Sequence, residues 1–332
     1  MNNSVLIPFA LSCSLAGLYC ANAWGDHPST TFGNINAGPL ITIAAPPLAA
    51  GQWSLGLRLE HVEQNPLSAA TLEQAALDDA DIHSVDSLTT TFIGLGYGLS
   101  DRFTLGITLP YTRRSGLREG HLHGATPEVH RHNDAEGLGD MTLLGHYLLH
   151  RSMAMDVALL AGVQLATGED DVRDNGALLE AELQPGIGTW QPLLGVAVSR
   201  PLTQGALDAN LLYRIGREGS QSFQPGDMLN YNLAWSLLLG HEDGHPGQAA
   251  PHTDWSIVLE LNGEWRDKDE SAGLAAPHSG GNLIYVSPGV RAALPHQFSL
   301  FGSLSLPVLE DLNGTQSEPD YRLMVGISKG FR

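Results

Sequence analysis

Apolar and polar residues alternate along most of this chain, in stretches about ten residues long. In QWSLGLRLE, residues 52–60, every second residue from Trp53 to Leu59 is apolar, and the residues between them are Ser, Gly and Arg. RFTLGITLPY, residues 102–111, and LNYNLAWSLLLG, residues 229–240, have the same period. A period of two predicts β-strands that bury one face in apolar surroundings and turn the other toward polar ones.

Twelve segments of the chain have this pattern. They cover residues 51–64, 86–99, 102–114, 138–150, 154–167, 190–200, 206–216, 228–240, 254–266, 282–294, 298–309 and 321–331. An even number of tilted strands of this length is typical of a bacterial outer-membrane barrel made from one chain. We therefore predict an all-β fold, a transmembrane antiparallel up-and-down β-barrel of about twelve strands.

The connections between these segments alternate in length. Long stretches such as 65–85, 115–137 and 168–189 follow one strand, and short ones such as 100–101, 151–153 and 295–297 follow the next. This predicts long extracellular loops at one end of a barrel and mostly short periplasmic turns at the other, with 241–253 as the one long exception. A secreted β-sandwich explains the alternation of residues but not this sidedness. The loop 65–85 has the Ala, Leu and Glu content of a short helix.

The N-terminus has the pattern of an export signal. An uncharged apolar run from Val5 to about Cys20 precedes Ala21-Asn22-Ala23, which fits a signal-peptidase site, so we expect a signal peptide at 1–23 and one barrel domain at 24–332. Both cysteines, Cys13 and Cys20, lie in this segment. The rest of the chain has no run of 18 or more apolar residues, the length that a membrane-spanning helix needs, so only a closed barrel could cross a bilayer.

The charged residues of the strands fall mostly on the face opposite the apolar one, which would be the lumen. Our candidates for pore-lining residues are Arg58, Glu60, Asp140, His146, Asp156, Asp208, Arg214, Glu260, Glu264, Arg291 and Arg322. The whole chain has 17 Lys and Arg against 36 Asp and Glu, a net charge of −19. This charge repels nucleic acid and favours cationic or neutral solutes.

Histidines are concentrated in two connections. GHLHGATPEVHRH holds His121, His123, His130 and His132, and HEDGHPGQAAPH holds His241, His245 and His252. Imidazoles beside carboxylates can capture Zn²⁺, Cu²⁺ or Ni²⁺, but a solvated polar loop is the simpler explanation of such tracts. The predicted sidedness places the first stretch outside the cell and the second in the periplasm, so the two could not share one ion.

Several longer motifs resemble a known family. GLGDMTLLGHY (137–147), LATGEDD (165–171), LQPGIGTWQPLLGVAVS (183–199), GGNLIYVSPGVR (280–291) and LEDLNG with PDYRLMVGISKGF (309–331) are similar to outer-membrane transporters grouped with the meta-pathway phenol-degradation proteins. The resemblance implies a twelve-stranded barrel and a transport role. It implies no residue-level site.

These observations lead to one functional expectation and two alternatives. We expect an outer-membrane channel or transporter for small solutes, with hydrophobic aromatics or divalent metal ions as substrates. The alternatives are a metal-capturing surface protein without transport and, less favoured, an outer-membrane hydrolase. The strands lack a Ser, His and Asn set on the lipid-facing parity, so we expect no enzyme and no cofactor beyond a possible divalent metal ion.

The expected partners follow from the same location. They are outer-membrane lipid and lipopolysaccharide, the transported solute, and the barrel-assembly machinery. The final segment ends at Phe331, and an aromatic at the end of the last strand is what the assembly machinery recognises in such barrels.

Overall fold

The computed structural model describes residues 38–80, 82–239 and 253–332. The predicted signal peptide and the second histidine stretch, with His241, His245 and His252, lie outside the described residues. No helix in the described part of the chain is long and apolar enough to cross a membrane.

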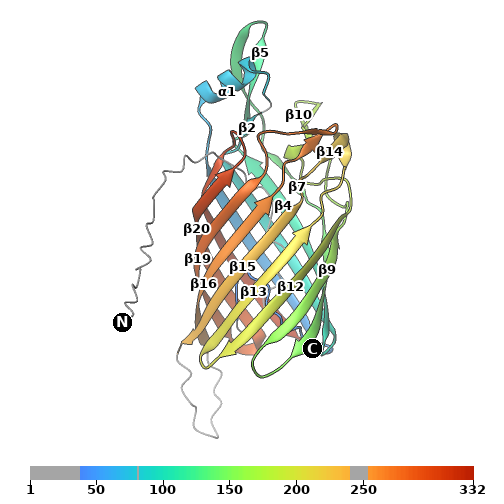
Figure 1. Ribbon diagram of the computed structural model, residues 1–332, viewed down its shortest axis with the longest axis vertical. Helices are drawn as coiled ribbons and strands as arrows, with labels where there is room; N and C mark the ends of the chain where they lie inside the picture. The colour runs from blue at the N-terminus through green and yellow to red at the C-terminus, as the bar shows by residue number, and fades with distance from the viewer. Residues whose placement is uncertain (1–37, 81, 240–252) are drawn as a thin grey trace, which may run out of the picture.

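Within those ranges, twelve strand positions form one closed antiparallel barrel (Figure 1). The sheet closes because β1 pairs with β3 on one edge and with β21 on the other, with Trp53 opposite both Tyr97 and Phe331. The strands are β1 (Trp53–Asn65), β3 (Ser87–Ser100), β4 (Phe103–Ser115), β8 (Thr142–Arg151), β9 (Asp156–Gln164), β12 (Gln191–Leu202), β13 (Gly205–Arg214), β15 (Met228–Leu239), β16 (Asp254–Arg266), β19 (Gly281–Leu294), β20 (Phe298–Leu312) and β21 (Glu318–Phe331). The predicted barrel and its sequential strand order are confirmed.

One predicted strand is interrupted. The segment expected to run through 138–150 consists of β7 (Ala135–Leu138) and β8, and both pair with β4. The break lies beside Pro110 of β4, which has no N–H to donate to the neighbouring strand. Gly139 donates to the Pro110 carbonyl at 2.9 Å, and regular pairing resumes only at Thr108 with Thr142.

The alternation predicted from the sequence appears as alternating exposure. On β16, Trp255 is 52% exposed and Leu259 44%, whereas Val258 and Glu260, at the alternate positions, are 0% and 1% exposed. Leucines on β1, β13, β20 and β21 are exposed in the same way. A belt of exposed large apolar side chains around a closed barrel matches a lipid-facing surface.

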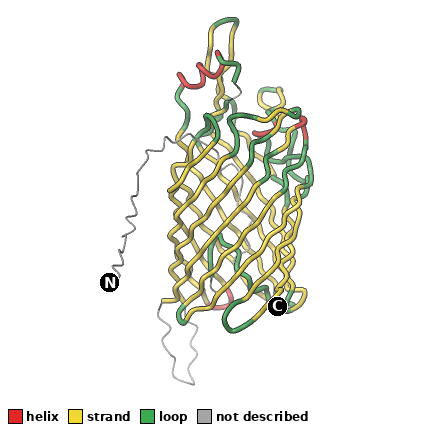
Figure 2. Tube along the Cα trace, viewed as in Figure 1, coloured by secondary structure: helices red, strands yellow, loops and turns green. Residues whose placement is uncertain are grey.

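The long connections build small structures at one end of the barrel, as Figure 2 shows. They comprise α1 (Ala69–Leu77), β2 (His83–Ser84), β5 (Arg118–His123), β6 (Thr126–Arg131), β10 (Arg173–Asp174), β11 (Ala177–Leu178), β14 (Phe223–Gln224), β17 (Glu270–Ser271), β18 (Leu274–Ala275) and the short 3-10 turns Ala181–Leu183 and Ser220–Ser222. A third 3-10 turn, Pro295–Gln297, joins β19 to β20 at the other end. The predicted helix in 65–85 is confirmed as α1, where the Ser68 hydroxyl accepts from the Thr71 amide at 3.1 Å.

Residues 38–50, which precede β1, lie inside the barrel, and we call them the lumen segment. Leu40 and Ile41 pack against Val258 and Met324 on β16 and β21. Ile43 and Ala45 pack in a cluster whose other members, Leu144, Ala158, Leu160, Leu193, Ala197 and Leu212, come from β8, β9, β12 and β13. The segment therefore contacts walls on different sides of the barrel. It leaves the lumen beside β3, where Gly51 donates to the Gly98 carbonyl at 2.8 Å.

The exit of the lumen segment requires a glycine in the wall. A Cβ on Gly98 would lie 2.0 Å from the Ala49 carbonyl oxygen, so Gly98→Ala should force the segment or β3 to move. We expect the free energy of unfolding in urea to fall by roughly 1–3 kcal/mol, the usual cost of overpacking. Gly56→Ala on β1 is the control, since its Cβ would have 3.8 Å of room. Equal stability of the two variants would contradict this packing.

Candidate functional site

The lumen segment is held chiefly by one carboxylate. Glu260 on β16 accepts hydrogen bonds from three consecutive backbone amides, those of Leu40, Ile41 (3.1 Å) and Thr42 (3.0 Å). The Thr42 hydroxyl also donates to Glu260 Oε2 at 3.2 Å. Hydrogen bonds to a charged group are among the stronger ones in proteins. A buried carboxylate that receives several of them fixes this stretch of backbone.

Other polar side chains of the wall continue the attachment. Asn210 Oδ1 accepts from the Ile43 amide at 2.8 Å, and Ser199 Oγ accepts from the Ala45 amide at 2.8 Å. His146 Nε2 lies 2.7 Å from the Ala45 carbonyl oxygen, and Arg291 Nη2 donates to the Pro39 carbonyl at 2.8 Å. The segment is not a strand of the sheet, so side chains of the wall take the place of a neighbouring strand as its hydrogen-bond partners.

The space left beside the segment is small. A cavity of about 30 Å³ lies between Ile41, Ile43 and the inner wall near Tyr285 and Arg322. Another of about 40 Å³ lies nearer the long loops, between Phe92, Gln184 and Arg214. A water molecule takes roughly 30 Å³ in the liquid, whereas a cavity that holds benzene measures roughly 150 Å³. Neither cavity admits a solute as large as an aromatic ring.

The structure places the predicted pore-lining residues in three environments. Glu260, Asp208, His146 and Arg291 hold the lumen segment or its partners; Ser199 Oγ, which binds the segment, donates to Asp208. Arg58, Glu60, Arg214, Glu264 and Arg322 lie on the inner face of the wall, where the Arg58 guanidinium sits 4.1 Å from the Phe92 ring and that of Arg322 4.4 Å from the Tyr285 ring. That any of them lines a path for solute stays a prediction.

Asp140 and Asp156 are the two candidates with other surroundings. The Asp140 carboxylate accepts from the amides of Thr167, Gly168 and Ile187 at 2.8–3.1 Å, so it organises the loop 165–190 at the mouth. Asp156 lies at the short β8–β9 turn, 3.5 Å from Arg151 Nε.

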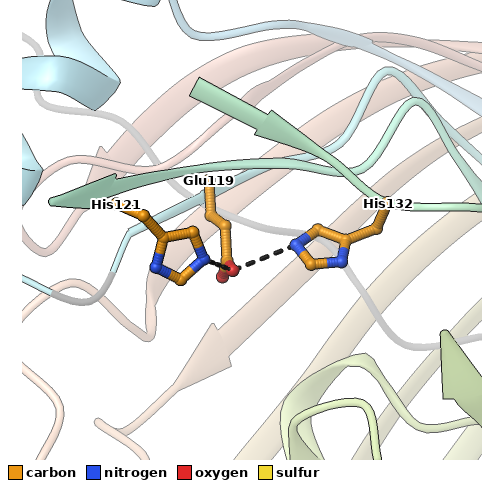
Figure 3. A group of neighbouring side chains, drawn as sticks. All are labelled: Glu119, His121 and His132. Atoms are coloured by element: carbon orange, nitrogen blue, oxygen red, sulfur yellow. Dashed lines mark hydrogen bonds and ion pairs between the residues drawn. The ribbon is translucent and has the colours of Figure 1, made fainter. Parts of the chain in front are cut away.

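The four histidines of the first stretch lie on or beside a β-hairpin rather than in an irregular loop. Strands β5 and β6 pair with each other, and β2 adds a third strand with His83 opposite Glu119. Glu119 Oε1 approaches both His121 Nε2 and His132 Nε2, the latter at 3.0 Å, as Figure 3 shows. His123 and His130, nearer the tip, bring their Nε2 atoms within 3.2 Å. Sequence reasoning found these histidines but missed Glu119 and His83 as their neighbours.

The charges at the base of this hairpin are strongly coupled. Burial opposes ionisation of Glu119, but the hydrogen bond and charge of His83, with the charges of His121 and His132, lower the pKa of Glu119 to about 2. Burial opposes the charge of His83 too, but Glu182, Glu119 and Glu180 raise the pKa of His83 well above its ordinary value. Glu119 is therefore an ionised carboxylate that His83 holds by one oxygen, at 2.7 Å.

The chain matches the model of a known protein family. The family described as the MetA-pathway of phenol degradation matches residues 73–308, which is more than half of the chain. The chain belongs to this family. The phenol-degradation family match begins within α1 and ends within β20, so it includes the histidine hairpin and leaves the lumen segment outside.

Solved structures with a similar fold are outer-membrane proteins. An outer-membrane channel from Pseudomonas putida F1 is 19% identical, with a TM-score of 0.58 over 86% of this chain and 98% of that chain. The NanC porin is 6% identical (TM-score 0.45, 82% and 98%), and the CymD monoaromatic hydrocarbon channel is 10% identical (TM-score 0.43, 86% and 90%). At these identities the first likeness shows the fold alone, and the other two add nothing to it. No curated protein sequence matches the chain.

The attachment of the lumen segment in this family member can be tested by weakening its main anchor. Glu260→Gln replaces one acceptor oxygen by an NH₂ group that cannot accept from the backbone amides, at a cost of roughly 1.5–3 kcal/mol for each charged hydrogen bond lost. We expect open events in planar-bilayer recordings to become roughly tenfold more frequent or more. Glu264→Gln is the matched control, four residues along the same inner face and bonded to Asn230 instead. Identical conductance of the two variants would contradict the role of Glu260.

Proposed function

We propose that this protein is an outer-membrane channel for small solutes, and that it opens when the lumen segment is displaced. The observation that carries the proposal is the occupied lumen: residues 38–50 contact several walls of a closed barrel, and the cavities beside them have the size of one or two water molecules. Individual hydrogen bonds to side chains, rather than a continuous ladder to a neighbouring strand, hold most of the segment. It can therefore leave the lumen while the ring of twelve strands remains intact.

Apolar solutes are the substrate class that the lumen favours. Beneath Ile43 and Ala45 the inner wall carries the side chains of Leu144, Leu160, Leu193 and Leu212, each at most 5% exposed. Withdrawal of the segment would uncover this patch, and an apolar solute could replace the side chains that now cover it. The family description, phenol degradation, agrees with small aromatic compounds as the solutes.

The alternatives predict different measurements. A metal-capturing surface protein would bind metal tightly and show no channel events. Ester or lipid hydrolysis by the purified barrel would support a hydrolase instead. We favour the channel because the apolar patch and the releasable segment both lie in the lumen, where neither alternative uses them.

We place the protein in the outer membrane, exported by the signal peptide at 1–23, with lipopolysaccharide around its long loops. Phe331, the last residue of β21, packs against Trp53 of β1 with ring centroids 6.5 Å apart. We expect deletion of Phe331 to abolish assembly, because the last strand would then lack the terminal aromatic residue that the assembly machinery recognises. Deletion of Arg332 should leave assembly unchanged. Outer-membrane fractionation checks both, and normal assembly without Phe331 would contradict this use of the C-terminus.

Displacement of the lumen segment can be tested by tethering it. Ala45 and Ser199 are adjacent, with the Ala45 amide 2.8 Å from Ser199 Oγ, and the chain has no cysteine besides Cys13 and Cys20. In an Ala45→Cys, Ser199→Cys variant treated with a short cleavable bis-thiol reagent, we expect uptake of phenol or toluene into proteoliposomes to fall severalfold and to recover when the bridge is cleaved.

The two single-cysteine variants, treated in the same way, control for modification of the lumen wall. Uptake that the bridge leaves unchanged would show that the solute passes without movement of the segment.

A further inference from the structure

The histidine hairpin has two chemically different faces. Glu119 lies opposite His130 in the β5–β6 register, and His121 lies opposite Glu128. Residues at alternate positions of a strand share a face, so Glu119, His121 and His123 point to the same side as Glu128 and His130. His132 continues this row just beyond β6. One face of the hairpin is therefore a strip of potential metal ligands.

The opposite face is covered by the helix. Val129 packs against the cluster of Leu72, Ala75 and Ile82, and a Cβ on Gly120 would lie 2.0 Å from the Leu72 carbonyl oxygen. Packing against α1 fixes the orientation of the hairpin, so the strip of potential ligands stays on the face away from the helix.

At the base of the strip, three ligand atoms converge. The Nε2 atoms of His121 and His132 both face Glu119 Oε1 (Figure 3), and these three ligand atoms all lie within 4.8 Å of one another. His132 Nδ1 lies 3.0 Å from Asp174 Oδ2, a contact that orients the ring with Nε2 toward Glu119. On the other side of the ring, Nε2 lies 3.0 Å from Glu119 Oε1. A cation placed between these three atoms would have all of them as ligands.

We propose that Glu119, His121 and His132 bind a divalent transition-metal ion of the Zn²⁺ type at the extracellular mouth of the barrel. In a tetrahedral zinc site with bonds of about 2.0–2.1 Å, neighbouring ligand atoms lie about 3.3 Å apart. The His132–Glu119 separation is 3.0 Å, and His121 Nε2 lies closer still to Glu119 Oε1, so the half-exposed His121 ring must move outward to admit the ion. Solvent would supply the fourth ligand, since His121 is half exposed.

The residues around these three ligands have the arrangement expected of outer ligand partners. Asp174 orients His132, as carboxylates do for the metal-bound histidines of many proteins. His83 binds the other Glu119 oxygen, Oε2, and is itself held by Glu180 and Glu182 at 3.1 and 2.7 Å. The ion would therefore join the hairpin to the loops that carry His83 and Asp174, tying three extracellular connections together.

The donor atoms also indicate which ion binds, and the burial of the ligands indicates which part of the hairpin binds it. Two imidazoles and one carboxylate suit Zn²⁺ or Cu²⁺, whereas Ca²⁺ and Mg²⁺ prefer oxygen ligands alone. His123, Glu128 and His130 form a second group at the tip, but all three are exposed. The base group alone has a buried carboxylate and fixed outer partners, so we assign the ion to the base. This assignment is independent of the transport proposal.

Calorimetric titration of the full-length protein in detergent with ZnCl₂ tests the site. The background should carry His241→Ala, His245→Ala and His252→Ala, so that the other histidine stretch contributes nothing. We expect one saturable site whose affinity falls at least roughly 10–100-fold in His121→Ala and in His132→Ala, and by a similar factor in Asp174→Asn. His150→Ala, at the opposite end of the barrel, should bind as the background does.

Spectroscopy with Co²⁺ and a tip variant make the outcome decisive. Visible absorption of bound Co²⁺ should appear in the background protein, weaken in Asp174→Asn and persist in His123→Ala, His130→Ala. A difference in gel mobility between heated and unheated samples shows that each variant is folded. Absence of Zn²⁺ binding, unchanged binding in His121→Ala and His132→Ala, or loss of binding only in the tip variant would each overturn the assignment.

Discussion

In the hydrocarbon of a membrane, every backbone amide and carbonyl must find its partner within the protein, and β1 meets this requirement by pairing on both edges. Closure of β1 onto β21 removes the free edges of the sheet. It also separates two surfaces, since alternate residues now face either lipid or an enclosed lumen. On β16, the buried Glu260 lies between the exposed Leu259 and Leu261, and this contrast between neighbouring positions results from the closure of the barrel.

The lumen segment faces the same requirement without a strand to pair with. Its residues from Leu40 to Ala45 are buried, so their amides need acceptors from the wall, and Glu260, Asn210 and Ser199 accept from the amides of Leu40 to Ile43 and of Ala45. Its side chains, in contrast, need apolar surroundings, which Leu144, Leu160, Leu193 and Leu212 supply. The mixture of polar and apolar side chains inside the barrel is thus complementary to a peptide, and the same mixture gives an entering solute an apolar surface among polar groups.

Sequence patterns predicted the barrel well because period-two alternation is a direct consequence of a wall with two different sides. They failed where side-chain patterning was absent or a neighbour intervened. The stretch PLITIAAPPLAA has apolar residues without alternation and three prolines, so its place in the lumen had no strand signal. The break between β7 and β8 depends on Pro110, which lies on a different strand.

The histidine stretch held a signal that could have been used: His121, His123, His130 and His132 sit at strand spacing. Glu119 has the same spacing, two residues before His121, whereas His83 and Asp174 come from other connections whose approach no local pattern reveals.

A twelve-stranded barrel with an empty interior would be a permanent hole in the cell's outermost barrier. With residues 38–50 in place, the two cavities beside them measure about 30 and 40 Å³, far less than the roughly 150 Å³ that holds one benzene molecule. A cell could therefore make many copies of this protein without becoming leaky. The occupied lumen would allow abundant expression as well as control of passage.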